Sequence, residues 1–221
     1  TEPFINENIL CVSLPNQWIS IACEPHKKFF GYVVWEGTSV PKGWIKYFLD
    51  KRVDYLLVPS EHTKKAILNT CDLKDRDCLN SKLVLVPHGI DKNVFKPLKR
   101  AKGDVYRFCA NKGWAQGMYD RGGLQWLIKA FNDEFKNEPV ELNIKLNTAY
   151  CGPGWNFDNE MSKLELKSDG CRINFVFDNF SVEKLNEFYN DNDVFVSPNM
   201  GEAFGLPIAE ALCAGLPVIT S

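Results

Sequence analysis

Two glutamates near the end of the chain stand eight positions apart, on either side of a predicted helix start. Glu202 lies in a loop bracketed by Gly201 and Gly205, and Glu210 lies about one turn inside the helix expected to begin at Pro207. Proline fits the first helical turn because the amide that it lacks would have no partner there. Backbone amides at such a helix start attract phosphate oxygens. The pattern indicates a ligand with a diphosphate and hydroxyl groups at both ends, such as a nucleotide diphosphate sugar.

The two glutamates belong to a segment with a strand–loop–helix–strand order. A short buried strand is predicted at 194–196, the helix at 207–214 and a last strand at 217–220. Gly215 suits the left-handed residue just past the helix end. The same order with two surface glutamates occurs in many α/β proteins. Spacing alone therefore does not exclude an ordinary structural unit without a ligand.

Strands alternate with helices along the rest of the chain, which favours parallel βαβ units and an α/β class. The other predicted strands are 9–14, 18–23, 31–35, 54–58, 83–86, 105–110, 142–146 and 173–177. The other predicted helices are 41–51, 60–69, 124–135 and 182–189. A polar, proline-bearing stretch without periodicity separates the two halves. We therefore expect one domain over 1–96, a linker over 97–103 and a second domain over 104–221.

Composition excludes several classes of protein. With 221 residues, 45% hydrophobic and 24% charged, the chain is not a disordered one. A formal net charge of −2 gives no electrostatic basis for binding nucleic acid. No apolar stretch reaches the roughly 18 residues of a membrane span, and the first residues do not resemble a secretory signal. We expect a cytoplasmic protein without a bound metal. The sequence does not decide whether Cys71 and Cys78 form a disulfide.

The run 201–220 reads GEAFGLPIAEALCAGLPVIT. It resembles the E-x7-E signature of retaining family-4-type glycosyltransferases, the glycosyl transferases group 1 type. Three upstream runs are similar to other segments of that family: 35–44, 58–61 and 86–97. The resemblance implies a GT-B fold: α/β, two Rossmann-like doubly wound domains facing a cleft, with the N-terminal domain short and the C-terminal end curtailed. A minimal enzyme and a partial chain both remain open.

The resemblance also implies roles for the two glutamates. Glu210 would accept hydrogen bonds from the donor ribose, and Glu202 would lie beside the transferred sugar. Backbone groups next to them would surround the sugar hydroxyls and phosphate: those of Phe204, Gly205 and Leu206.

A basic pair ahead of the first helix of the second domain holds the donor diphosphate in that family. Here the matching residues are Lys112, beside Gly113, and Arg121, with the loop between them lengthened. Lys112, Arg121 and Glu202 are thus the expected catalytic residues, although two solvated surface cations would give the same pattern. Glu36 and His26 are candidates for the acceptor side, with a loop carboxylate and a turn histidine as the plainer interpretations.

The activity implied is transfer of a hexose from a UDP or GDP sugar to a hydroxyl of a glycan, lipid or protein, with retention and without a metal or other cofactor. A non-catalytic nucleotide-sugar-binding module or scaffold is the main alternative, and an epimerase or phosphorylase is a distant one. Self-association into a homo-oligomer and peripheral membrane contact stay open. The sequence does not indicate which base and sugar the donor carries or which molecule is the acceptor.

Overall fold

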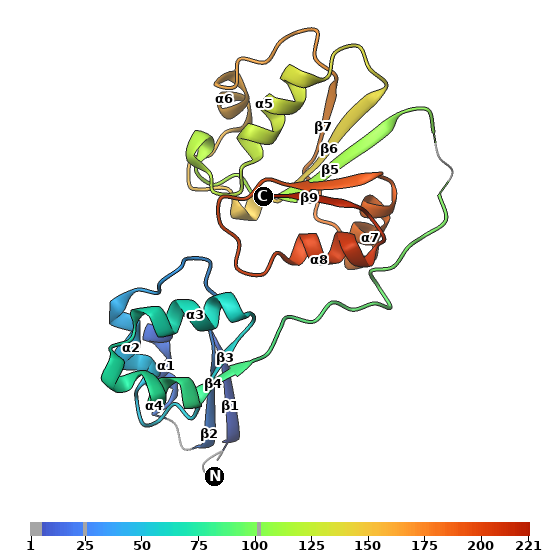
Figure 1. Ribbon diagram of the computed structural model, residues 1–221. Helices are drawn as coiled ribbons and strands as arrows, with labels where there is room; N and C mark the ends of the chain where they lie inside the picture. Colours follow the sequence, from blue (N-terminus) through green and yellow to red (C-terminus); the bar gives the residue numbers. More distant parts are fainter. Residues whose placement is uncertain (1–5, 24–25, 101–102) are drawn as a thin grey trace. The chain divides into compact units, whose positions relative to one another are not determined.

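The computed structural model describes residues 6–23, 26–100 and 103–221, which form two α/β units (Figure 1). The first comprises the chain up to Gly89 together with Glu202–Phe204, and the second comprises Ile90–Gly201 and Gly205–Ser221. The sequence placed the boundary seven residues later, at 96. The structure divides earlier because Ile90, Val94 and Phe95 pack in the core of the second unit.

The stretch expected to be a linker is held by the second unit as far as it is described. The Leu98 amide donates to Asn190 Oδ1, and the Arg100 guanidinium forms an ion pair with Asp193. Residues 101 and 102 of the predicted linker lie outside the described residues.

The first unit has a four-stranded parallel sheet in the order β1-β2-β3-β4. Its strands are β1 Asn6–Val12, β2 His26–Tyr32, β3 Tyr55–Val58 and β4 Leu83–Leu85. Its helices are α1 Pro15–Ile21, α2 Ile45–Phe48, α3 Glu61–Thr70 and α4 Arg76–Lys82, with 3-10 turns η1 Lys42–Trp44 and η2 Leu73–Asp75. The cap predicted for α3 is confirmed, since Ser60 Oγ accepts the Thr63 amide at 3.2 Å.

The strand predicted at 18–23 is wrong, because this segment belongs to helix α1 and the turn after it. Its buried residues, Pro15, Trp18 and Ala22, follow helical spacing. Trp18 is fully buried beside Phe29 and lies against Gly31, where a Cβ would overlap the indole ring. Packing of one large indole therefore overrides the strand propensity of the neighbouring isoleucines.

Within the described residues, the four helices of the first unit cover one face of its sheet. Buried side chains of these helices, including Phe48, Ile67 and Leu79, pack in one cluster with Phe29 and Leu56 of the strands. On the opposite face apolar side chains are exposed: Leu10, Val12, Tyr55 and Val84.

The second unit has a five-stranded parallel sheet in the order β7-β6-β5-β8-β9. Its strands are β5 Tyr106–Lys112, β6 Val140–Leu146, β7 Arg172–Val176, β8 Val194–Ser197 and β9 Val218–Thr220. Its helices are α5 Leu124–Glu134, α6 Phe157–Ser162, α7 Val182–Asn190 and α8 Leu206–Cys213, with 3-10 turns η3 Gly117–Tyr119 and η4 Thr148–Tyr150.

This sheet is covered on both faces. Helices α5 and α6 pack on one face in a cluster that includes Ile128 and Leu142, and α7 and α8 pack on the other in a cluster that includes Tyr189 and Ala211. The chain runs outward from β5 to β7, then returns to form β8 on the other side of β5. The topological switch point thus lies at the paired strands β5 and β8, and ligands of open α/β sheets bind at the carboxyl ends of the strands there.

Candidate functional site

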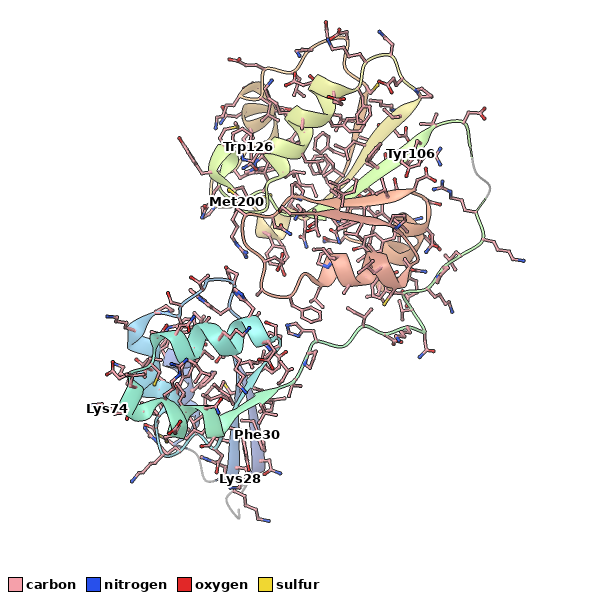
Figure 2. The ribbon with its side chains drawn as sticks, in the orientation of Figure 1. Lys28, Phe30, Lys74, Tyr106, Trp126 and Met200 are labelled. Atoms are coloured by element: carbon pink, nitrogen blue, oxygen red, sulfur yellow. The ribbon has the colours of Figure 1, made fainter. Side chains whose placement is uncertain are left out.

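Two loops meet at the switch point of the second unit. The loop 113–123 follows β5 and leads into α5, and the loop 198–205 follows β8 and leads into α8. The Met200 amide donates to the Arg121 carbonyl at 2.8 Å, so the two loops are joined through their backbones. Met200 itself is exposed and is labelled in Figure 2.

Both cations singled out in the sequence reach toward the loop after β8. Lys112 Nζ donates to Asn199 Oδ1, and Arg121 Nη1 donates to the Gly201 carbonyl at 2.7 Å. The Lys112 side chain also lies beside Gly122, where a Cβ would be 3.8 Å from its Cδ. The structure therefore brings Lys112 and Arg121 to one loop at the carboxyl edge of the sheet, where their two positive charges can act on one anion.

Asp120, which the sequence did not single out, organises the loop that carries Arg121. Its buried carboxylate accepts backbone amides on both sides: Oδ2 from Ala115 at 2.8 Å and Gln116 at 3.2 Å, and Oδ1 from Gly122 at 2.8 Å. An aspartate that accepts amides of its own turn is a common device of such loops. The signal available in the sequence was Asp120 directly before Arg121 and a pair of glycines.

Gly123 caps α5 and brings its start close to the loop after β8. Its φ of +71° lies in the left-handed region, and a Cβ there would overlap the carbonyl oxygen of Pro198. Gly113 is also tightly placed, since a Cβ on it would be 2.6 Å from Tyr150 Cβ. Glycine at 123 thus allows the close approach of the two loops, and glycine at 113 allows the loop after β5 to pack against η4.

Gly123→Ala is expected to lower the free energy of unfolding by at least about 2 kcal/mol, from left-handed strain and from overlap with Pro198. Two matched variants separate these causes. Gly154 has a φ of +74° with open space where a Cβ would stand, so Gly154→Ala should cost about 1 kcal/mol. Gly43→Ala has neither penalty and should be neutral or better. Urea denaturation of the three variants checks this order, and equal costs for Gly123→Ala and Gly154→Ala would contradict it.

Helix α8 begins one residue earlier than predicted, after Gly205, whose φ is +79°. Glu202 and Phe204 group with the first unit. There the Phe204 ring lies edge-on against His88 with centroids 4.8 Å apart, and Glu202 Oε1 accepts the Ala203 amide at 3.1 Å. Within the second unit, the backbone at the start of α8 is therefore that of Gly205, the N-cap, and Leu206, the first helical residue.

Glu210 lies on α8 in a partly buried hydrogen-bond chain. Asn111 Nδ2 donates to the Tyr189 hydroxyl at 3.0 Å, and that hydroxyl donates to Glu210 Oε2 at 2.7 Å. Burial raises the pKa of Glu210, and the hydrogen bond from Tyr189 opposes that rise. Burial also raises the pKa of Tyr189, so this hydroxyl stays protonated as a donor. Asn111 and Tyr189 were not expected from the sequence, because β5 and α7 bring them to Glu210 only in the fold.

The two acceptor-side candidates lie at opposite ends of β2. His26 is the first residue of that strand, and its ring lies 5.8 Å from that of Phe29. Glu36 follows the carboxyl end, where His62 Nε2 is 3.0 Å from the Glu36 carbonyl oxygen. A seven-residue strand spans roughly 20 Å. The structure therefore does not bring His26 and Glu36 together, and only Glu36 lies at the sheet edge where α/β folds bind ligands.

Other features of the described residues bear on the sequence expectations. Cys71 and Cys78 are free thiols, the first buried and the second exposed. No group of three or more His, Cys, Asp and Glu side chains is arranged to hold a metal ion in the part of the chain that the structure describes. Over the same residues, none of the helices has both the length and the apolar character to cross a membrane.

Residues 113–221, just under half of the chain, match the family model described as Glycosyl transferases group 1. No curated protein matches the sequence. The second unit thus resembles the group 1 glycosyltransferases in its sequence, which supports that part of the resemblance.

Solved glycosyltransferase structures resemble the chain over nearly its whole length. Sucrose-phosphate synthase from Thermosynechococcus elongatus is 16% identical, with a TM-score of 0.65, and the match covers 96% of this chain and 55% of that one. The pneumococcal O-GlcNAc transferase GtfA, in complex with UDP and GlcNAc, is 15% identical, with a TM-score of 0.67 and coverage of 98% and 42%. A trehalose-6-phosphate synthase studied for glycosyl transfer with retention is 12% identical, with a TM-score of 0.67 and coverage of 98% and 58%.

These likenesses, together with two parallel α/β sheets, confirm the expected α/β, GT-B fold. The chain spans about half the length of the structures it matches.

Proposed function

We propose that the chain acts in a retaining glycosyltransferase that moves a hexose from a nucleotide diphosphate sugar to a hydroxyl acceptor. The observation that carries the proposal is the convergence of Lys112 and Arg121 on the loop between β8 and α8. That convergence lies at the switch point of a parallel sheet, beside a helix start that offers backbone amides. The family match of this unit and the E-x7-E run through Glu202 and Glu210 point to the same chemistry.

The residues have separate roles in this proposal. Lys112 and Arg121 bind the diphosphate with the backbone of Gly205 and Leu206, next to Gly113. Glu210, held by Tyr189, accepts a hydrogen bond from the ribose. Glu202 and the Phe204 backbone contact the transferred sugar, and Glu36 lies on the acceptor side. These roles follow from the resemblance in the 201–220 run and from the positions of the second-unit residues.

The proposed reaction needs no protein nucleophile. The bond from the anomeric carbon to the diphosphate oxygen breaks, and the acceptor oxygen bonds to that carbon on the same face. The acceptor proton passes to the departing phosphate oxygen, so a nucleoside diphosphate leaves. Lys112 and Arg121 stabilise the negative charge that grows on the diphosphate, which is where electrostatic catalysis lowers the barrier. We propose that these two cations serve without a metal ion.

A thermal-shift panel of nucleotide sugars tests donor binding. UDP sugars come first, because the GtfA structure contains UDP. Ligand at about 100 times its dissociation constant should stabilise the fold by about 2.7 kcal/mol, which raises the Tm by several degrees. Uridine and free glucose serve as controls and should shift it far less. No shift with any UDP or GDP sugar would contradict the proposal, and binding without transfer would favour a non-catalytic module.

A further inference from the structure

Tyr189 is fully buried and cannot contact a ligand itself, yet its hydroxyl is part of the hydrogen-bond chain that ends at Glu210. Its ring lies among three phenylalanine rings whose centroids are 5.7 to 6.2 Å away: Phe95, Phe188 and Phe195. These contacts leave the phenol little freedom to move. A hydroxyl that is fixed in this way can fix the group to which it bonds.

The groups of the chain set the direction of both hydrogen bonds. The Asn111 amide nitrogen can only donate, so the Tyr189 oxygen accepts from it at 3.0 Å. The single hydroxyl proton of Tyr189 is then directed to Glu210 Oε2 at 2.7 Å. Each hydrogen bond in such a chain polarises and strengthens the next. Asn111 thus supports the bond by which Tyr189 holds the carboxylate.

Glu210 is a side chain for which an anchor matters. It is partly exposed on α8, and a free glutamate loses rotamer freedom when a ligand orders it. Among the described residues, the hydrogen bond from Tyr189 is the one that holds this carboxylate. The bond engages Oε2 and leaves Oε1 to accept from a ligand. A side chain that is ordered beforehand does not have to be ordered at the moment of binding.

We propose that Tyr189, supported by Asn111, is a positioning residue for the donor ribose: it holds Glu210 by Oε2 and leaves Oε1 to accept from a ribose hydroxyl. The inference rests on the proposed function and adds two uncharged residues that lie outside the E-x7-E run. Without the anchor, Glu210 would have to be ordered when the donor binds, which weakens affinity by roughly two- to tenfold.

The same hydrogen bond helps to keep Glu210 ionised. Burial raises the pKa of Glu210, and the hydrogen bond from Tyr189 lowers it. Loss of the hydroxyl should therefore raise the pKa of Glu210 further, because the ionised form loses a donor. Donor affinity should then fall away at a higher pH than in the parent chain. A purely structural role for Tyr189 would not produce this change.

The other ionisable groups on the elements around Glu210 are neutral, exposed or engaged with another residue. On β5, Cys109 is a buried thiol that stays neutral because burial raises its pKa, and Lys112 donates to Asn199. The charged residues of α7 are exposed: Glu183, Lys184 and Glu187. Those of the segment 90–96 are exposed as well: Asp91, Lys92 and Lys96. Helix α8 carries Glu210 as its single charged residue.

Isothermal titration calorimetry of Tyr189→Phe tests the proposal on the whole chain, with whichever of UDP-glucose and GDP-mannose binds the parent chain more tightly. These donors are used because the terminal phosphate of UDP itself titrates at about pH 6. Affinity at neutral pH should fall about two- to tenfold, and its acidic limit should move to higher pH. Tyr32→Phe is the matched control, since this buried hydroxyl donates to the Val86 carbonyl at 2.9 Å. It should lose a similar amount of stability in urea and bind the donor normally.

A double-mutant cycle shows whether Tyr189 acts through Glu210. In a Glu210→Ala background, Tyr189→Phe should have no further effect on affinity, because the positioned group is gone. Asn111→Leu should weaken binding by a smaller factor than Tyr189→Phe, and it should have no effect once Tyr189→Phe is present. Asn143→Leu, which removes an amide that donates to Asn192, is its control and should bind like the parent chain.

The outcomes separate the inference from the proposed function. Unchanged affinity and an unshifted pH profile in Tyr189→Phe, with normal binding by the parent chain, would overturn the inference alone. An equal loss of affinity in the Glu210→Ala background would also overturn it, because Tyr189 would then not act through Glu210. Failure of the parent chain to bind either donor would contradict the proposed function, and the positioning role with it.

Discussion

Arg121→Ala is expected to lower the turnover of a nucleotide sugar by about 10²- to 10³-fold, the size of effect seen when one group that stabilises developing charge is removed. Arg121 lies two residues before the cap of α5, and its Nη1 already reaches the loop after β8. The guanidinium can donate two parallel hydrogen bonds to phosphate oxygens. Arg121→Lys keeps the charge but not the fork, so its turnover should lie between those of the parent chain and the alanine variant.

A stability measurement and a control variant show whether a loss of turnover comes from the Arg121 side chain itself. Because the Arg121 side chain is on the surface, the unfolding transition of Arg121→Ala should stay close to that of the parent chain. Lys129→Ala removes a cation from α5 that pairs with Asp133 and should leave turnover unchanged. Radiolabelled nucleotide-sugar assays measure all three variants. Normal turnover in Arg121→Ala would contradict the role given to this residue.

Glu210→Gln should weaken donor binding by about 10- to 100-fold, because one charge-assisted hydrogen bond from the ribose is lost. The same variant should not destabilise the unliganded fold at neutral pH. The amide oxygen of glutamine can still accept the hydrogen bond from Tyr189. Glu187→Gln, an exposed carboxylate on α7, is the matched control and should bind donor normally. Calorimetric titration with UDP compares the two variants.

The pH dependence of stability gives a second readout for Glu210. Burial raises the pKa of this carboxyl in the folded state above its unfolded value, so the folded protein disfavours the ionised form. The stability that Glu210 gives is thus present below the unfolded pKa and is lost as pH rises through the folded pKa. Relative to the parent chain, Glu210→Gln should gain free energy of unfolding between roughly pH 4 and pH 7. Urea denaturation at several pH values checks this, and a loss of relative stability toward pH 7 would contradict it.

Most elements of the fold could be predicted from the sequence, because turn residues and apolar periods mark them locally. Gly215 and Pro207 delimit α8, and Ser60 caps α3 as expected. The failure at 18–23 has a long-range cause, since Trp18 meets Phe29 and Phe48 only after the strands pair. Helices α4 and α6 were missed because their sequences are polar and short.

The site could be predicted where the sequence resembles a known family. Lys112 and Arg121 were matched to the basic pair of that family, and the structure brings both to one loop. Asp120, Tyr189 and Asn199 were not, because a buried aspartate, tyrosine or asparagine becomes informative only when its hydrogen-bond partners are known. The relation of Tyr189 to Glu210 depends on the packing of α7 on α8, which residue spacing does not encode.

Comparison of uridine, UMP and UDP by isothermal titration calorimetry measures how much the diphosphate contributes to binding, because the three ligands differ only in phosphate. If Lys112 and Arg121 bind the diphosphate, the affinity of the parent chain should rise steeply from UMP to UDP. This rise should vanish in the Lys112→Ala/Arg121→Ala double variant. Equal affinities for uridine and UDP in the parent chain, or an undiminished rise in the double variant, would contradict the account.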